Sequence, residues 1–498
     1  MSSLQVMMSV GLLLFLALMA YLGWLGYRRT QTVADFAIAG AAMGPVTLGL
    51  AFAATFFSAA TFVGYTGWAY GWGLSSLWIV LTLIIASPLG LIVVAKRVRN
   101  INTGQGSLSL PDWLGDRYGS SFLRVVVALA TLFNLFYIAA HFSAGGLSFQ
   151  QLLGPPYLVG LVAIAVIVTL YTVGGGSFAD IYTDAAQALL MALTGLLVLV
   201  SGFWVFDKGF TGIMREVTAT LEAQDPSMVA VVNPDSAVFY SVPPIVGAFI
   251  IQFAFSSQPH LFNKVLALRD PADMAKMILT YVLCAIAFLS VVFGGLYAAV
   301  VVPGLESADA AIMEYAQVAF PTILVALLGV TVLAAAMSTS DGIFVVISTS
   351  IANDIYRKFL VPRGLMGKNV PEEEIDRRTL SISRWLTALT GVAATLLVIR
   401  PPDFIGTFIW IGISGVASAT LGPILVALFL PRLASARAAS ISAVAGLVGY
   451  LVIHFIGFEK STLAAGAWAV LVGLAAMVVA GLVFREDAKT LARANASN

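Results

Sequence analysis

The segment MGPVTLGLAFAATFFSAATFVGYTGWAYGW, residues 43–72, decides the fold class because no charged side chain interrupts it. A helix of about 20 apolar residues crosses the hydrocarbon core of a bilayer, which is about 30 Å thick. The segment is longer than one crossing requires, and this length indicates either a tilted helix or a helix with a break. We therefore predict a transmembrane helix here and look for function among its few polar groups.

The whole chain shares this apolar character. Of its 498 residues, 60% are hydrophobic and 10% are charged, against about 25% charged in an ordinary soluble domain. This composition excludes a soluble enzyme and a disordered protein, because a soluble exterior must be wetted. The 26 Lys and Arg residues against 25 Asp and Glu residues leave no basic surface for nucleic acid. We predict an all-α polytopic membrane protein surrounded by a lipid bilayer.

Thirteen segments are long and apolar enough to be predicted as transmembrane helices. They are residues 6–27, 43–72, 75–95, 122–149, 157–173, 183–206, 243–257, 277–302, 321–352, 380–399, 404–430, 438–455 and 462–484. With the N-terminus outside and the C-terminus inside, 22 of the 26 Lys and Arg residues fall on the cytoplasmic side, as the positive-inside rule requires. The hydrophilic stretch 207–236 is predicted as an outer loop, and the stretch 353–378 as a solvated inner loop with a surface helix, in which the NDIY residues close the preceding helix. The glycines at 174–176 are predicted as a tight cytoplasmic turn.

Four local motifs resemble the sodium:solute symporter family, whose members include sodium-coupled transporters of proline, pantothenate, sialic acid, monocarboxylates and sugars. The motifs are AATFFSAATFVG at 53–64, GG at 174–175 with TDAAQ at 183–187, QPH at 258–260, and AAMST at 335–339 with NDIY at 353–356. They occur in the family's order and spread over most of the chain. By this resemblance, the QPH motif is expected at the inner end of the seventh span.

The resemblance implies a LeuT-type fold with two inverted repeats of five helices, one leading helix and two trailing helices. The leading helix and first cytoplasmic loop would be residues 1–42, and the first repeat 43–206. An extracellular loop would occupy 207–242, the second repeat 243–430, and the trailing helices with a cytoplasmic tail 431–498. Transporters with inverted repeats place substrate and ion near the midplane, where broken helices expose backbone carbonyls.

The resemblance also implies a sodium site, with Na⁺ as the coupling ion. Sodium is a hard cation that prefers oxygen ligands, and Ser338 and Thr339 place adjacent hydroxyls in an apolar helix. The family motif adds the backbone carbonyls of Ala54, Phe57 and Ala335. On spacing alone, hydrogen bonds within or between membrane helices would be the favoured role of the two hydroxyls. The flanking motif favours the ion site.

Asp184 and Asp341 are informative because an intramembrane carboxylate costs several kcal/mol and marks function by default. In part of the family, the residue that matches Asp184 helps to bind a second sodium with hydroxyls on the ninth span. Two serines are expected there, whereas this chain has Asp341 and Gly342. The two carboxylates form a candidate second cation or proton site. Asp341 could bind the cation, share a proton with Asp184 or face the inner vestibule.

Purely structural roles are also possible for the acidic residues. Asp184 could be a helix N-terminal charge that the helix dipole favours. Asp180 is predicted to lie at a turn or an interface rather than in the site.

Family geometry places the solute beside the sodium. The candidate contacts are Ser58, Thr61, Tyr137, His141, Gln252, Trp410 and Ser414. Each has a bland alternative, since Ser, Thr and His often only link membrane helices and the aromatic residues could be packing residues. No Arg or Lys is predicted deep in the core, which disfavours a dianion. A small neutral, zwitterionic or monoanionic solute is expected.

The sequence predicts a sodium-coupled symporter that imports a small carboxylate, such as a monocarboxylate or a pantothenate-like acid, by alternating access across the inner (plasma) membrane. A proline-like amino acid is the alternative solute, and protons that titrate Asp184, Asp341 or His141 are the alternative coupling ion. A transporter-like sensor or a channel would be a different class, but no segment reads as a signalling domain or a ring of pore charges. No HExxH motif occurs and the three histidines are scattered, so an enzyme is not expected.

Overall fold

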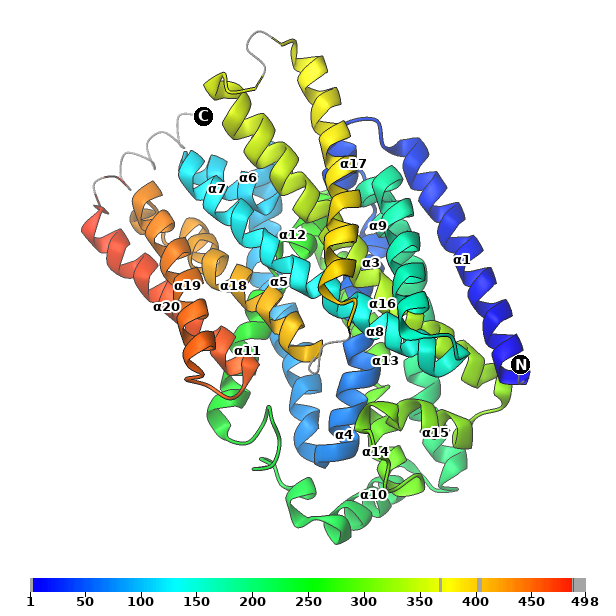
Figure 1. Ribbon diagram of the computed structural model, residues 1–498. Helices are drawn as coiled ribbons and strands as arrows, with labels where there is room; N and C mark the ends of the chain where they lie inside the picture. Colours follow the sequence, from blue (N-terminus) through cyan, green and yellow to red (C-terminus); the bar gives the residue numbers. More distant parts are fainter. Residues whose placement is uncertain (1–2, 367–369, 401–404, 486, 488–498) are drawn as a thin grey trace.

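The computed structural model describes residues 3–366, 370–400, 405–485 and 487, and over these residues the chain is helical (Figure 1). The β contact recorded among them is an isolated parallel bridge between Met43 and Leu268. Lys368, Lys489 and Arg493, which are among the predicted cytoplasmic cations, lie outside the described residues, as does residue 404 at the predicted start of the eleventh span.

The helices follow one another along the chain with short connections. The first half contains α1 (Ser3–Arg29), α2 (Val33–Ile38), α3 (Pro45–Phe56), α4 (Thr66–Trp72), α5 (Leu77–Gln105), α6 (Leu110–Tyr118), α7 (Ser121–Ala130), α8 (Asn134–Leu153), α9 (Tyr157–Val205) and α10 (Phe210–Gln224). The second half contains α11 (Val242–Phe255), α12 (Pro259–Leu266), α13 (Met274–Leu289), α14 (Val292–Val301), α15 (Ala311–Ala319), α16 (Thr322–Thr349), α17 (Glu372–Leu397), α18 (Ile405–Phe429), α19 (Ala436–Ile456) and α20 (Thr462–Val483).

Two π-helical segments extend these helices, and short 3₁₀ turns join others. The π-helical segments are η2 (Ala60–Tyr65) and η8 (Ser350–Leu360). The 3₁₀ turns are η1 (Ala39–Ala41), η3 (Gly73–Ser76), η4 (Thr131–Phe133), η5 (Pro226–Val229), η6 (Pro271–Asp273), η7 (Ala308–Ala310), η9 (Val361–Arg363) and η10 (Pro431–Leu433).

Residue chemistry sets where several of these helices begin. The first N–H groups of a helix have no partner within it, and serine hydroxyls accept hydrogen bonds from them. Ser120, Ser435 and Ser461 do this for α7, α19 and α20. Pro45 and Pro259 are the first residues of α3 and α12, a position where a missing N–H and a fixed φ cost nothing.

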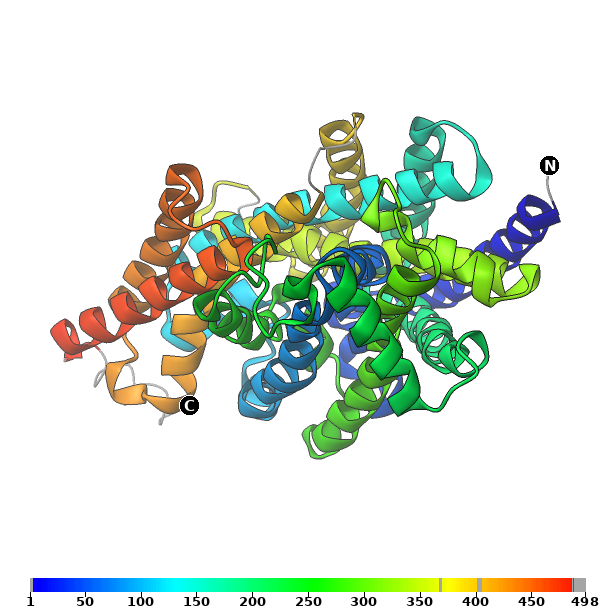
Figure 2. The same ribbon diagram turned by 90° about the horizontal axis from the view of Figure 1, so that it is seen from below.

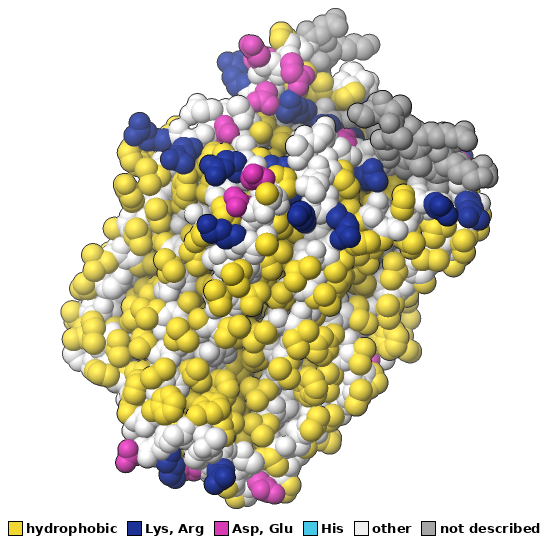
Figure 3. All heavy atoms as spheres, turned by 180° about the vertical axis from the view of Figure 1, so that it is seen from behind, with side chains coloured by type: hydrophobic (Ala, Val, Ile, Leu, Met, Phe, Trp, Pro, Cys, Tyr) yellow, Lys and Arg dark blue, Asp and Glu magenta, His cyan; other side chains and the backbone are white. Residues whose placement is uncertain are grey.

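The long helices form one bundle, with α1 on one flank and the pair α19 and α20 on the other (Figures 1 and 2). The span that contains α16 is central, because 78% of its apolar window is buried, against 22% for α1. Figure 3 shows a broad apolar band between two polar ends. Most Lys and Arg side chains on this face gather at the end that carries α6 and the start of α17.

By length and composition, ten of the described helices could span a membrane, or up to eleven if the bent pair α11 and α12 is one span. The predicted thirteen spans, the orientation of the termini and the division into repeats stay predictions. Helix α9 alone covers the predicted fifth and sixth spans. Its 49 residues would extend for about 74 Å at 1.5 Å per residue, more than twice the hydrocarbon core.

The predicted tight turn at residues 174–176 is a break inside α9. Gly176 has φ +49° and ψ −139°, a conformation that glycine tolerates and other residues rarely adopt. A Cβ at this position would lie 2.6 Å from the Phe36 ring, so space also demands glycine here. The chain therefore turns without leaving helical geometry on either side.

One predicted boundary is wrong, and two hydrophilic stretches contain helices. The QPH motif does not end the seventh span, because Pro259 begins α12, which continues after a bend of 42° as far as Leu266. The stretch 353–378 contains helical residues, as predicted, but Asn353 and Asp354 are fully buried instead of solvated, because η8 prolongs α16 to Leu360. In both places polar residues lower the local hydropathy, although their side chains are buried in the protein. The stretch 207–236, predicted as an outer loop, contains the helix α10.

Candidate functional site

Two broken helices meet at the centre of the bundle. Helix α3 ends at Phe56, and Phe57 after it is extended, with φ −103° and ψ 123°. Helix α11 ends at Phe255 before the bend into α12. The rings of Phe56 and Phe255 have centroids 4.4 Å apart, so the two breaks lie side by side. A helix break exposes carbonyls that would otherwise bind N–H groups four residues on.

Four of the five predicted sodium ligands gather at the last turn of α3, and the fifth, Phe57, directly follows that turn. Ser338 Oγ of α16 donates to the carbonyl of Ala54 at 3.0 Å and to that of Ala335 at 3.3 Å. Thr339 Oγ1 donates to the carbonyl of Thr55 at 3.1 Å. All five residues are buried. The group offers uncharged oxygens of the kind that a hard cation binds, and it draws them from two helices.

Four charged residues form a second buried group, which we call the core cluster: Asp180 and Asp184 of α9, Asp341 of α16 and Lys264 of α12. The three carboxylates each have an oxygen within 4.8 Å of those of the other two. Lys264 Nζ lies 2.6 Å from Asp180 Oδ2 and 2.9 Å from Asp184 Oδ2. No side chain of the four is more than 3% exposed.

Further donors surround these carboxylates. Asp341 Oδ2 accepts hydrogen bonds from Tyr171 Oη at 3.1 Å and from Thr183 Oγ1 at 3.2 Å. Thr55 Oγ1 donates to Asp184 Oδ2, while the Thr55 carbonyl accepts from Thr339. Thr55 therefore joins the core cluster to the predicted sodium ligands.

Sequence reasoning missed Lys264 and misplaced Asp180. The expectation that no Arg or Lys lies deep in the core is wrong, because Lys264 is 1% exposed. Its position four residues after His260 places it on the same face of α12, and this spacing within an apolar helix was the available signal. Asp180 lies one helical turn before Asp184 and belongs to the core cluster instead of a turn or an interface. Thr55 was quoted in a motif without a role.

An aromatic and imidazole group lies beside the bend of α11 and α12. The Tyr137 ring on α8 is 4.7 Å from the His141 ring and 6.0 Å from the His260 ring, between centroids. Phe255 lies 6.4 Å from Tyr137 and 6.0 Å from His260. His141 Nδ1 is 2.8 Å from the Tyr137 carbonyl. Two predicted contacts, Tyr137 and His141, thus come together with His260, which was known only from its motif.

Several buried polar atoms around this group have no hydrogen-bond partner within the described part of the chain. They are His141 Nε2, both ring nitrogens of His260, Gln252 Oε1, Gln258 Oε1, and Oδ1 and Nδ2 of Asn134. Asn134 precedes Tyr137 by one turn of α8, and Gln252 precedes Phe255 by one turn of α11, so each shares a helix face with an aromatic wall. A buried polar atom without a partner costs about 1–3 kcal/mol, and a polar ligand would satisfy it.

The other predicted contacts lie in other segments, after α3 and in α18. Ser58 lies at the break after α3, and its carbonyl accepts a hydrogen bond from the backbone N–H of Thr61 at 2.8 Å. Trp410 and Ser414 are buried in α18. Ser414 does not face Tyr137, because its Oγ would lie 2.3 Å from a Cβ at Gly466 of α20. The structure therefore brings Ser414 to the trailing helices rather than to the imidazoles.

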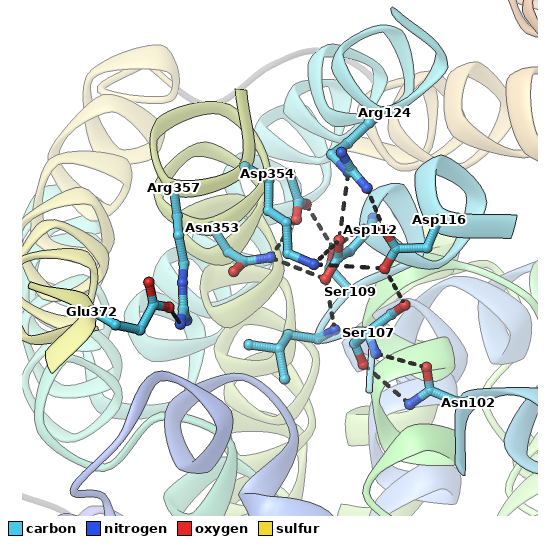
Figure 4. A network of polar contacts seen from close by, with 12 residues as sticks. Asn102, Ser107, Ser109, Asp112, Asp116, Arg124, Asn353, Asp354, Arg357 and Glu372 are labelled. Carbon is cyan, nitrogen blue, oxygen red and sulfur yellow. Dashed lines mark hydrogen bonds and ion pairs between the residues drawn. The ribbon is translucent and has the colours of Figure 1, made fainter. Parts of the chain in front are cut away.

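A third polar group closes the end of the bundle predicted to be cytoplasmic (Figure 4). We call Asp112, Asp116, Arg124, Asp354 and Lys358 the end network. Asp112 Oδ1 lies 3.4 Å from Arg124 Nε and 3.2 Å from Lys358 Nζ. Arg124 also pairs with Asp116, and Lys358 Nζ is 3.6 Å from Asp116 Oδ2. Burial, with the charge of Asp112 added, raises the pKa of the Asp116 carboxyl.

The end network is held to η8 by uncharged groups. Ser109, the N-cap of α6, donates to Asp354 Oδ2 at 2.6 Å. Asn353 Nδ2 donates to Asp354 Oδ1 at 2.7 Å and to Asp112 Oδ2 at 3.3 Å. Helix α6 is thereby fixed to the same long helical segment, α16 and η8, that carries Ser338, Thr339 and Asp341 further along.

Comparison with known proteins identifies a matching family and similar transporters. The family model described as the sodium:solute symporter family matches residues 36–448. The osmoregulated proline transporter OpuE of Bacillus subtilis (strain 168) is 24% identical over 505 residues, which cover 99% of this chain and 97% of that protein. The sodium/proline symporter of Escherichia coli (strain K12) is 25% identical over 82% of this chain and 80% of its own length.

Solved structures match the fold. A substrate-bound, outward-open Na⁺-coupled sialic acid symporter is similar with a TM-score of 0.77 and 18% identity, over 96% of this chain and 98% of that one. The nucleobase-cation-symport-1 transporter Mhp1 in a closed conformation gives a TM-score of 0.54 and 14% identity, over 93% and 99%. These likenesses show that the fold is of the LeuT type.

Proposed function

The chain belongs to the sodium:solute symporter family, and on that premise we propose that it imports a proline-like amino acid together with sodium across the plasma membrane. Sodium is the coupling ion. The solute, the residues that bind it and the residues that bind sodium are the proposal.

One observation carries the choice of solute: the atoms without partners near Tyr137 include both donors and acceptors. An amino acid presents a carboxylate that only accepts hydrogen bonds and an ammonium group that only donates them. A ring N–H of His260 and the amide N–H groups of Asn134 suit the carboxylate. The amide oxygens of Gln252 and Gln258 suit the ammonium. His141 Nε2 also suits the ammonium, because Nδ1 donates to the Tyr137 carbonyl and leaves Nε2 as an acceptor. The rings of Tyr137 and Phe255 suit a small apolar body.

A simple carboxylate fits this group less well. It would satisfy donors and leave the buried amide oxygens without a partner, at a cost of about 1–3 kcal/mol each. The matched relatives named above are proline transporters, which supports the amino acid as well. The small carboxylate that the sequence favoured is therefore the weaker choice.

Coupling follows from where sodium would bind. A sodium ion held by the hydroxyls of Ser338 and Thr339 and the exposed carbonyls of Ala54 and Phe57 would fix the break of α3 against α16. Ser58 and Thr61 follow that break directly, so its geometry sets where they lie relative to the solute. A ligand shifts a protein toward the conformation that it binds best, and sodium would in this way assemble the solute site before the protein turns inward.

The driving force distinguishes the two solutes. A zwitterion carried with one sodium moves one positive charge inward, which is worth about 2.3 kcal/mol per 100 mV. Since about 1.4 kcal/mol is tenfold, the potential alone supports an accumulation of roughly 50-fold. A monocarboxylate carried with one sodium would be electroneutral and would draw on the sodium gradient alone.

Uptake of labelled proline into proteoliposomes, with the potential set by potassium and valinomycin, tests the proposal. We expect uptake that requires external sodium, increases with a negative interior and is inhibited by amino acids of similar size but not by propionate or pantothenate. Inhibition by the carboxylates alone, with no effect of potential, would favour the carboxylate. Uptake driven by a pH gradient without sodium would contradict sodium coupling.

A further inference from the structure

The core cluster holds three carboxylates that are buried in the protein, where such charges need a cation. Isolated buried carboxylates are too costly to remain unpaired. Oxygens that bind a hard cation lie about 2.3–2.6 Å from it, so oxygens within 4.8 Å of one another are close enough to share one ion. By composition and spacing, Asp180, Asp184 and Asp341 are a cation site.

The cation at this site belongs to the protein itself. Lys264 Nζ lies between Asp180 Oδ2 at 2.6 Å and Asp184 Oδ2 at 2.9 Å. We propose that the Lys264 ammonium is the resident cation of the core cluster, so that this site takes no sodium and the Ser338 and Thr339 pair remains the one sodium site. This inference rests on the sodium symport proposed above and adds the number of ions carried.

The ammonium would exclude sodium because it is covalently attached to a buried helix next to the carboxylates. Lys264 is on α12, which begins at Pro259 beside the bend and is buried along its length, so its side chain is always within reach of the carboxylates. Two unit charges about 4 Å apart repel by about 4 kcal/mol at an effective dielectric constant of 20. By the tenfold per 1.4 kcal/mol rule, this repulsion weakens sodium binding beside the ammonium by roughly 1,000-fold.

A chain of hydrogen bonds connects the ammonium to the predicted sodium ligands. Lys264 and Thr55 Oγ1 share the same oxygen of Asp184, Oδ2, and the Thr55 carbonyl accepts from Thr339. Lys264 therefore acts as a positioning residue: it fixes Asp184, which fixes the last turn of α3 at the sodium ligands. A bound ion in the core cluster would serve the same purpose, but it would have to be carried and released in each cycle.

Equilibrium binding of ²²Na⁺ to the purified full-length protein, with saturating proline, tests the inference. We expect one sodium per wild-type protein, one for the conservative variant Lys264→Arg and two for Lys264→Gln, in which the ammonium is lost. The matched control Lys358→Gln, in the end network, should bind one. Folding is checked by elution as a single species on gel filtration.

The outcomes separate this inference from the proposed symport. Two sodium ions on the wild type, or one on a folded Lys264→Gln, would overturn the resident cation and leave sodium symport intact. No sodium on the wild type would contradict the symport itself. If Lys264→Gln does not fold, the count on the wild type and on Lys264→Arg decides, because two ions on either contradicts the inference.

Discussion

The core cluster and the end network are built from the same parts and differ in surroundings. Each contains three aspartates and a lysine, and both are anchored on the long segment of α16 and η8. In the core cluster, three carboxylates share one ammonium, and Lys264 is 1% exposed. In the end network they share two cations, and Lys358 is 36% exposed, where water and salt screen it.

The difference in burial indicates which of these charges contribute most to stability. Breaking a buried ion pair leaves an uncompensated charge and costs about 3–5 kcal/mol, whereas an exposed pair is worth about 0–1 kcal/mol. Because Asp112 keeps Arg124 and Asn353 when Lys358 is removed, the end network has a reserve. The core cluster has no second cation among the described residues to take over from Lys264.

The largest expected effect is therefore the loss of the Lys264 ammonium. In sodium-free buffer, Lys264→Gln should lower the free energy of unfolding by about 3–5 kcal/mol, because three buried carboxylates lose their cation. High sodium should restore part of the loss if an ion takes the vacated position. Thermal unfolding in choline and in sodium chloride measures both effects, with Lys358→Gln as the control. Equal destabilisation of the two variants would remove the contrast between the clusters.

The second effect tests whether the sodium ligands are separate from the core cluster. Thr339→Ala should raise the sodium concentration for half-maximal proline uptake by roughly 10- to 100-fold, since a hydrogen-bonding contact to a charge is worth about 1.5–3 kcal/mol. Ser340→Ala removes a neighbouring buried hydroxyl that binds only the Ala336 carbonyl, at 3.4 Å, and serves as control. An unchanged sodium requirement in Thr339→Ala would contradict the ion site.

A third, smaller effect tests the solute group away from both clusters. Gln252→Leu should raise the KM for proline about tenfold with an unchanged sodium requirement, because a hydrogen bond to a charged group such as the solute ammonium contributes about 1.5–3 kcal/mol and Gln258 is still present as a second acceptor. Gln224→Leu, at the end predicted to be outside, where the Gln224 side-chain amide donates to the Ala299 carbonyl, is the matched control. A change in sodium requirement with no change in KM would place Gln252 with the ions and not with the solute.

The apolar pattern predicted the all-helical membrane architecture because burial in lipid constrains every residue of a span. The break in α3 was indicated by the length of segment 43–72, and the family motifs brought Ala54, Ala335 and Ser338 to one place in the structure. Local patterns of this kind survive folding, since the residues that carry them are neighbours along the chain.

The pattern of apolar residues could not predict which polar side chains pair with one another across helices. Lys264 was one of the 22 Lys and Arg residues predicted to lie on the cytoplasmic side, because hydropathy counts a buried, paired lysine and a solvated one alike. Its partners lie 80 and 84 residues away. Asn353 and Asp354 were placed in a solvated stretch for the same reason, although both are buried. The orientation of Ser414 depended on Gly466, whose missing side chain makes room for the hydroxyl. Such contacts are properties of the packed structure.

The smallest expected effect concerns the end network and the loss of its exposed lysine. Lys358→Gln should lower stability by no more than about 1 kcal/mol, because the lysine is partly exposed and Asp112 retains Arg124, Asn353 and the backbone N–H of Leu108. Proline uptake should stay within about twofold of the wild type, and the small loss of stability should shrink further in high salt, where an exposed pair is screened. Thermal unfolding at low and high ionic strength, in choline salts to avoid specific sodium binding, checks both points. A loss of stability as large as that of Lys264→Gln, and independent of salt, would contradict this prediction. It would mean that the Lys358 ammonium chiefly holds α6 to η8. The two clusters would then be equally essential despite their different exposure to water.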